Sequence, residues 1–236
     1  MKRTIIVTDL TRFNNQTIVC TAGIDRVTGE CIRPMPYLQG SECKRLKLLP
    51  GALLAGDFTL ARNVSGPHRE DHHYSNLRFE GPCTAEQFRN VLIESCFPGV
   101  EAGFEIKLPA GQKYLPAGHP VQRSIITIAV APMDLRIVED KFNPGKIKLH
   151  FKDGSGHPFG FISVTDLGFH DYAMKHHDAN DLMAVNHLLQ SQNEVFLRIG
   201  LSREYAAEDG RKGYWLQANG IYSFPMFHEG IRSYAP

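Results

Sequence analysis

The sequence lacks several features that would place it in a specialised class of protein. Apolar runs such as "SIITIAVAPM" are far too short to span a membrane. The N-terminal "MKRTIIVTDL" has no apolar segment of the kind found in signal peptides, so we expect a cytoplasmic protein. The net charge is only +1 over 236 residues, which gives no overall electrostatic argument for a nucleic-acid partner.

Cysteine is scarce, and its arrangement excludes two further classes. The chain has five cysteines, an odd number, and none of them forms a CxxC pair: Cys20, Cys31, Cys43, Cys83 and Cys96. This argues against a disulfide framework and against a zinc site built from thiolates. We therefore expect free, mostly buried thiols, and we predict no cofactor.

The common catalytic motifs are also missing. The sequence contains no GxSxG nucleophile elbow, no GxxxxGK[ST] phosphate loop, no GxGxxG and no HExxH. We assign no catalytic residue on this basis, and the sequence favours a protein that is not an enzyme.

Short segments rich in β-branched and aromatic residues, separated by Gly, Pro, Asn or Asp, are typical of strands. They cover residues 4–9, 16–24, 56–62, 124–130, 146–151, 159–164, 194–200 and 214–222. The stretch "GIDRVTGECIRP" predicts a hairpin in which Asp25 and Gly29 form the turn. Because Pro34 and Pro36 follow, Arg33 is predicted at a strand end near the rim of a sheet.

Two helices are predicted among these strands, over 84–97 with a Thr84–Gln87 capping box and over 178–190 with Asp178 as N-cap. They do not alternate regularly with strands, which argues against a parallel doubly wound sheet. The predicted fold class is mainly β with accessory helices (α+β), arranged as two small β-barrels. The Pro- and Gly-rich segment 107–122 predicts a boundary that divides the chain into 1–115 and 116–236.

The letters "VTDL" occur twice, with Asp9 in the first copy and Asp166 in the second. Two such carboxylates could ligand one divalent ion. Asp at the end of a strand more often accepts backbone N–H groups of the following turn, so we expect that role for both.

Two clusters rich in histidine, "PHREDHHY" and "FHDYAMKHHDAND", could supply metal ligands. A metal-dependent nuclease or hydrolase that uses His68, Asp71, His176 and Asp178 is one alternative function. The other interpretation is that both stretches are polar loops with no established metal-binding pattern.

Basic residues at predicted strand ends accompany aromatic residues in the same strands and turns, a combination that single-stranded nucleic-acid binders use for phosphates and bases. The predicted nucleic-acid-binding residues are Arg12, Arg33, Arg198, Arg203, Lys212, Tyr214 and Trp215. Neighbouring residues of a strand point to opposite faces, so one of Tyr214 and Trp215 is expected in the core. A purely structural hairpin and a protein–protein adaptor remain alternatives.

Together, "VTDLTRF", "TIVCTAGIDRVTGECIRP", "PHREDHHY", "FISVTDLGF", "FLRIGLSREY" and "GYWLQANGIY" resemble the prokaryotic dual OB-containing domain family. The resemblance implies two OB-like β-barrels and a nucleic-acid-binding role, in bacterial defence or nucleic-acid metabolism, with no established catalytic residues. It covers most of the chain. The positions that match are Asp9, Arg12, Gly23, Asp25, Cys31, Arg33, Pro34, His68, Glu70, Asp71, Asp166, Leu167, Gly200, Ser202, Arg203, Gln217, Asn219 and Gly220.

Overall fold

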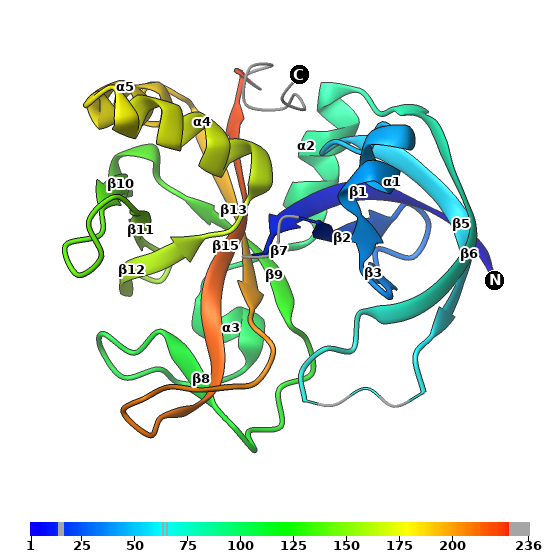
Figure 1. Ribbon diagram of the computed structural model, residues 1–236, viewed down its shortest axis with the longest axis horizontal. Helices are drawn as coiled ribbons and strands as arrows, with labels where there is room; N and C mark the ends of the chain where they lie inside the picture. Colours follow the sequence, from blue (N-terminus) through cyan, green and yellow to red (C-terminus); the bar gives the residue numbers. More distant parts are fainter. Residues whose placement is uncertain (14–16, 63, 65, 227–236) are drawn as a thin grey trace.

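Two β-sheets, one built by strands before residue 83 and one by strands after residue 95, organise the fold (Figure 1). In this computed structural model residues 1–13, 17–62, 64 and 66–226 are described. Gln16, which begins the predicted strand 16–24, and residues 227–236 of the predicted second half lie outside them. No helix of the described chain has both the length and the hydropathy that a membrane span requires.

The first sheet closes into a barrel. Its strands are β1 (Lys2–Arg12), β2 (Ile18–Asp25), β3 (Cys31–Met35), β4 (Leu38–Gln39), β5 (Ala52–Leu60) and β6 (Asp71–Pro82). The order β1-β5-β6-β3-β2 returns to β1 because β2 also pairs with β1. All of these neighbours are antiparallel except β3 and β6, which are parallel. Helix α1 (Gly40–Arg45) follows the third strand of the barrel.

The second sheet is larger. Its strands are β7 (Cys96–Phe97), β8 (Tyr114–Pro116), β9 (Ile125–Val130), β10 (Leu135–Glu139), β11 (Ile147–Lys152), β12 (Pro158–Val164), β13 (Glu194–Leu201), β14 (Tyr205–Ala206) and β15 (Lys212–Phe224). The main order is β10-β11-β12-β15-β13-β9-β7, and β8 and β14 pair with β15.

This order repeats the topology of the first barrel. The chain runs from β9 through the short helix η1 (Pro132–Asp134) into β10, and these two strands pair with β13 and β11. They therefore act as one interrupted first strand that joins the two ends of the sheet. Strands β12 and β15 are parallel, as β3 and β6 are in the first barrel. Helices α4 (Leu167–Asp178) and α5 (Leu182–Gln190) follow β12, at the place α1 occupies in the first barrel. The structure thus confirms a mainly β protein with two OB-like barrels.

Helix α2 (Ala85–Glu94) connects the barrels and packs between them (Figure 1). Thr84 and Gln87 form the predicted capping box. Its buried side chains, Phe88, Val91 and Leu92, belong to an apolar cluster that also contains residues of both sheets: Ile6, Ile24, Phe196, Tyr222 and Phe224. Each barrel has its own separate core besides this cluster.

The predicted hairpin of β2 and β3 is confirmed. Ile24 pairs with Cys31, and Asp25 Oδ1 accepts the amides of Val27 at 2.8 Å and Thr28 at 3.0 Å. Gly29 supplies the left-handed residue of the turn with φ of 71°. The predicted position of Arg33 at the rim was wrong, because β3 continues through Pro34 and pairs with β6.

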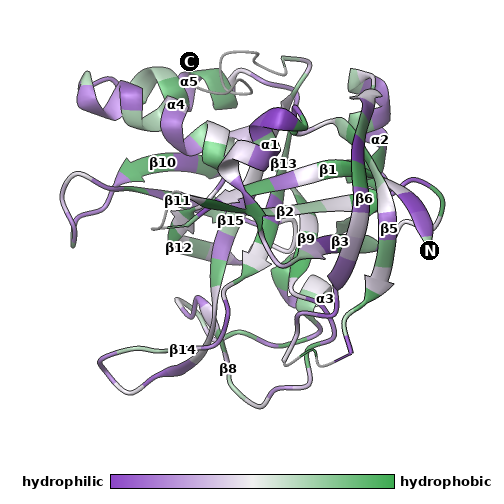
Figure 2. Ribbon diagram, turned by 45° about the vertical axis from the view of Figure 1, so that its right-hand side comes forward, coloured by the Kyte–Doolittle hydropathy of each residue, from purple (hydrophilic) through white to green (hydrophobic). Residues whose placement is uncertain are grey.

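Strand β6 was not foreseen, since "DHHYSNLRFEGP" reads as a polar loop. Figure 2 shows it largely in the hydrophilic colour, yet it pairs with β5 along its length. Most of its side chains alternate between partly buried and exposed, so few apolar residues were needed for it.

Two expected segment limits were also wrong. Residues 178–190 form the end of α4 and the whole of α5, with Asn180 in the left-handed conformation between them (φ 57°). Asp181, not Asp178, caps α5. In addition, β7 and β8 pair with strands of the second sheet, so residues 96–116 do not belong to the first sheet.

The two "VTDL" segments lie side by side but serve different roles. Thr11 forms a β-bridge with Asp166, and the Arg12 amide donates to the Thr165 carbonyl at 2.9 Å. Asp166 has the expected role: it caps α4 by accepting the Phe169 amide at 3.1 Å, and it accepts the Ile221 amide at 2.9 Å. Asp9 lies within β1 at a bulge, and among the described residues it accepts no backbone N–H group, so the expectation for it was wrong.

Asp166→Ala should therefore lower the free energy of unfolding by about 2–4 kcal/mol, because it removes a helix cap together with the buried carboxylate that accepts the Ile221 amide. Asp181→Ala is the matched control, because Asp181 caps α5 at the surface, and it should cost only about 1 kcal/mol. Urea denaturation of both variants measures the difference. Equal losses would contradict the bridging role of Asp166.

Candidate nucleic-acid interface

A buried polar layer joins the two barrels, and its central contact is an ion pair between β1 and β13. Arg198 is 1% exposed, and its Nε and Nη2 lie 3.0 and 2.8 Å from Asp9 Oδ2. Its Nη1 donates to Thr127 Oγ1 at 2.8 Å, and its Nη2 lies 3.4 Å from Cys31 Sγ. Burial raises the pKa of the Cys31 thiol to about 12, against the opposing effect of Arg198, so this thiol stays protonated.

Asp71, at the start of β6, binds two arginines from different barrels. Arg33 Nε lies 2.6 Å from Asp71 Oδ1, and Arg203 Nη1 lies 2.8 Å from Asp71 Oδ2. Burial raises the pKa of Asp71, but the hydrogen bonds and charges of the two arginines outweigh it and lower the pKa below its usual value. Arg203 also donates to the Tyr37 hydroxyl at 2.9 Å.

Glu70, the residue before Asp71 in the chain, completes the layer. Its carboxylate accepts the Ser124 amide at 2.6 Å, the Ser124 hydroxyl at 2.7 Å and the Ile125 amide at 3.2 Å. Glu70 therefore links the loop before β6 to Ser124 and Ile125, at the start of β9. We call Asp9, Arg33, Glu70, Asp71 and Arg198 the inter-barrel polar layer.

A groove runs along the junction of the barrels beside this layer. It consists of two adjoining pockets of about 550 and 410 Å³ that share Arg12, Phe13 and Gln217. The first pocket is basic: Lys146 and Lys148 of the β10–β11 region line it together with His170 of α4. Arg12 Nη1 lies 2.6 Å from His170 Nε2. Because Arg12 lines both pockets, its positive charge lies where they meet.

The second pocket, which we call the aromatic pocket, has rings from both barrels. Phe13 and Tyr37 come from the first barrel, with ring centroids 4.9 Å apart. Tyr205 and Trp215 come from the second, with centroids 5.4 Å apart and planes at 76°. Trp215 also stacks on Tyr114 at 5.2 Å and 21°, which fixes its orientation. Arg203 and the buried His68 line the same pocket.

His68 is the most unusual group of this pocket. It is 2% exposed, and neither ring nitrogen makes a hydrogen bond of good geometry to the described residues, although the Ser202 backbone lies near enough to affect its pKa. Burial, together with the charges of Arg33 and Arg203, lowers its pKa to about 3, although Asp71 and the Ser202 backbone oppose the shift. The imidazole is therefore neutral at physiological pH and offers one donor and one acceptor.

The structure brings together four of the seven predicted nucleic-acid-binding residues: Arg12, Arg33, Arg203 and Trp215 all line the aromatic pocket. Lys212 is exposed and pairs with Glu204, which lines that pocket. Tyr214 is 7% exposed and packs in the core of the second barrel, so of the two aromatic residues, one of which was expected in the core, it is Tyr214 that lies there. Arg198 forms an ion pair with Asp9 and lines neither pocket of the groove, so it is not part of this interface.

The residues of the metal alternative do not converge. The described part of the chain contains no group of three or more His, Cys, Asp or Glu side chains placed to hold a metal ion. The oxygens of Asp71 are engaged by Arg33 and Arg203. His176 lies 3.6 Å from Asp181, and Asp178 is at the end of α4 next to His177. The nuclease or hydrolase hypothesis thus lacks a site in these residues.

Sequence reasoning missed Lys146, Lys148, His170 and Gln217 as parts of the groove. His170 lies in a histidine-rich cluster and Gln217 in a motif of the family resemblance, but neither pattern indicates a groove. These residues come from α4, β15, β11 and the turn before β11, and they meet because the end of β1 lies against Thr165. The aromatic residues Phe13 and Tyr205 were recognisable by type, but not by their common location.

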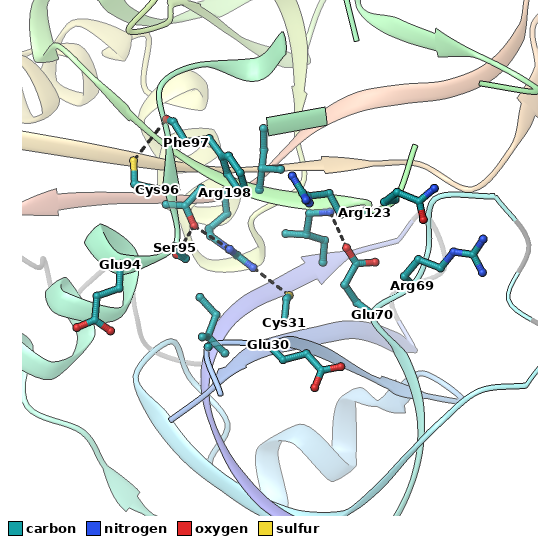
Figure 3. Close-up of a pocket in the computed structure, with 16 residues that line it drawn as sticks. Glu30, Cys31, Arg69, Glu70, Glu94, Ser95, Cys96, Phe97, Arg123 and Arg198 are labelled. Carbon is teal, nitrogen blue, oxygen red and sulfur yellow. Dashed lines mark hydrogen bonds between the residues drawn. The ribbon is translucent and has the colours of Figure 1, made fainter. Parts of the chain in front are cut away.

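A further pocket of about 460 Å³ reaches the polar layer from the side of α2 (Figure 3). Arg198 extends through it toward Cys31, and Glu70 and Arg123 lie across from Glu94 and Cys96. Its charges are mixed, and Arg123 is paired with Glu105 at 3.0 Å. This pocket therefore shows no preference for an anionic ligand, in contrast to the groove.

Two OB-like barrels joined by a buried polar layer, with a basic and aromatic groove along their junction, define a protein of the dual-barrel class. The chain belongs to the dual OB-containing domain family, whose model matches residues 2–221. Among curated proteins, none is significantly similar to it in sequence.

Asp9→Asn should lower the free energy of unfolding by about 3–5 kcal/mol, because it leaves the charge of Arg198 buried without a counter-charge. The double variant Asp9→Leu with Arg198→Met should recover much of that loss, because it removes both charges. Denaturant titration compares the three proteins. Asp9→Asn with unchanged stability would contradict a role in joining the barrels.

The neutral His68 should make folding sensitive to acid. The unfolded histidine titrates near pH 6.5 and the folded one near pH 3, so the unfolded state binds the extra proton between these values. Stability should be fully present above pH 6.5 and fall by up to about 1.4 kcal/mol per pH unit below it. His68→Gln should flatten this part of the profile; an unchanged profile would contradict the buried neutral state.

Proposed function

We propose that the protein is a non-catalytic binder of single-stranded nucleic acid, and that the strand lies in the groove between the barrels. The observation that carries this proposal is the union of cations and aromatic rings in one groove. Arg12, Lys146 and Lys148 supply positive charge at one end, and Trp215 and Tyr205 supply rings at the other. Cations neutralise phosphates and rings stack on bases, which is how single strands are bound without a duplex.

The form of the groove favours a single strand over a duplex. Its two pockets have volumes of about 550 and 410 Å³, and the rings of the aromatic pocket come from both barrels. Rings in such a position can stack only on bases that are not already stacked within a helix. The family supports OB-type binding, and we place this protein, as the sequence resemblance implies, in bacterial defence or nucleic-acid metabolism, inside the cell.

Titration of labelled single-stranded DNA and RNA over a salt series tests the proposal. The logarithm of the binding constant should fall linearly with the logarithm of salt concentration, by about 0.7 per phosphate contacted. Arg12→Ala and Lys148→Ala should each weaken binding of every sequence and reduce this slope by about one contact. Tyr205→Ala, at a 58% exposed ring, should cost about 1–3 kcal/mol of binding with little effect on the slope.

Lys44→Ala is the control, because Lys44 is exposed on α1 and lines neither pocket of the groove. It should leave affinity and slope as they are. No binding of single strands at low salt would overturn the proposed function, and so would equal weakening by Lys44→Ala and Lys148→Ala. Tighter binding of duplex than of single strands would move the site elsewhere on the surface.

A further inference from the structure

The aromatic pocket differs in chemistry from the rest of the groove. Lys146, Lys148 and His170 line only the neighbouring basic pocket, where a phosphate backbone has cations to contact. The aromatic pocket has a volume of about 410 Å³, within the range of small-molecule sites, and is walled by rings of both barrels. Its shape and walls suit a flat aromatic group.

The charges of Arg33 and Arg203, which line this pocket, lie against carboxylates. Arg33 donates to Asp71 and to Ser124, and its Nη2, which has no hydrogen-bond partner among the described residues, lies 4.0 Å from Glu70. Arg203 donates to Asp71 and to the Tyr37 hydroxyl. A phosphate placed deep in the pocket would have to compete with these buried carboxylates, so a neutral ligand group is favoured there.

Two neutral hydrogen-bonding groups, His68 and Gln217, also line the pocket. Neither ring nitrogen of the buried His68 makes a hydrogen bond of good geometry to the described residues, and a buried polar group in this state costs free energy that a ligand can recover. The amide of Gln217 lines the same pocket and also offers a donor and an acceptor. A nucleobase edge carries the complementary donors and acceptors, whereas a phosphate has acceptors only.

We infer that the aromatic pocket holds one nucleobase of the bound strand, between the rings of the two barrels and with its hydrogen-bonding edge against His68 and Gln217. This inference rests on the proposed function. It adds that the affinity depends on the base sequence, because the base at one position of the strand contacts a buried histidine. The phosphates on either side of that nucleotide then lie near Arg12, where the two pockets meet.

Trp215 makes the test direct, because it is the single tryptophan of the chain and it lines the pocket. Its fluorescence is followed during titration with the four nucleoside 5′-monophosphates and with ribose 5-phosphate, which has the same phosphate but no base. We expect saturable changes with the nucleotides, dissociation constants that differ between bases by about 10-fold or more, and no saturable change with ribose 5-phosphate.

His68→Ala should weaken the preferred nucleotide by about 10-fold and bring the four dissociation constants together. His68→Gln keeps a donor and an acceptor and should retain part of the preference. Lys44→Ala again serves as the control with unchanged constants. Thermal unfolding of each variant shows whether it is folded, so that a loss of preference is read only from folded protein.

The outcomes separate this inference from the proposed function. Equal binding of ribose 5-phosphate would overturn the inference and mark a phosphate site. The same follows if mononucleotides leave Trp215 unchanged, or if the base preference survives in His68→Ala. In each case salt-dependent binding of oligonucleotides would still support the proposed function. Failure of oligonucleotides to bind, with base-dependent binding of mononucleotides, would overturn the function but keep the pocket.

Discussion

The ion pair between Asp9 and Arg198 is the contact on which the arrangement of the two barrels depends. Both side chains are almost completely buried, at 0% and 1% exposure, and they come from strands of different barrels. A buried charge without a partner is strongly unfavourable, so the barrels can bury these two groups only where they meet. Docking pairs the two charges in one orientation, because a bifurcated guanidinium contact tolerates little displacement. Because residues of both barrels line the groove, its shape depends on that orientation.

The short motifs of the family acquire a common explanation from this layer. Asp9 of the first "VTDL", Arg33 of "CIRP", Glu70 and Asp71 of "PHRED", and Arg203 of "SREY" all bind across the junction of the barrels. The second "VTDL" contributes through Asp166, which orients α4 and holds β15. These motifs therefore specify how the barrels are joined, while the barrels themselves are specified by apolar alternation that many sequences satisfy.

The same division explains what could be predicted from the sequence. Every strand that was expected from β-branched and aromatic residues is present, because the alternation of apolar and polar residues in such a segment indicates which of its faces is buried. The sequence of β6 has no such pattern. Its pairing with β5 and β3 follows from the closure of the barrel and not from its polar side chains. Arg33 and Arg198 were recognised as important cations, but their roles depend on Asp71 and Asp9, which lie 38 and 189 residues away. No local spacing carries that information.

The distribution of charge between the layer and the groove also bears on specificity. Carboxylates of the polar layer neutralise the charge of Arg198 and much of the charge of Arg33 and Arg203, whereas Lys146 is exposed and Arg12 lies beside His170. Electrostatic attraction for phosphate is thus concentrated at the basic end of the groove. At the aromatic end, burial and then the charges of Arg33 and Arg203 lower the pKa of His68 and hold it in its neutral form, which has one donor and one acceptor. The arginines that join the barrels therefore also help to set the protonation state of the histidine that we infer to contact a base.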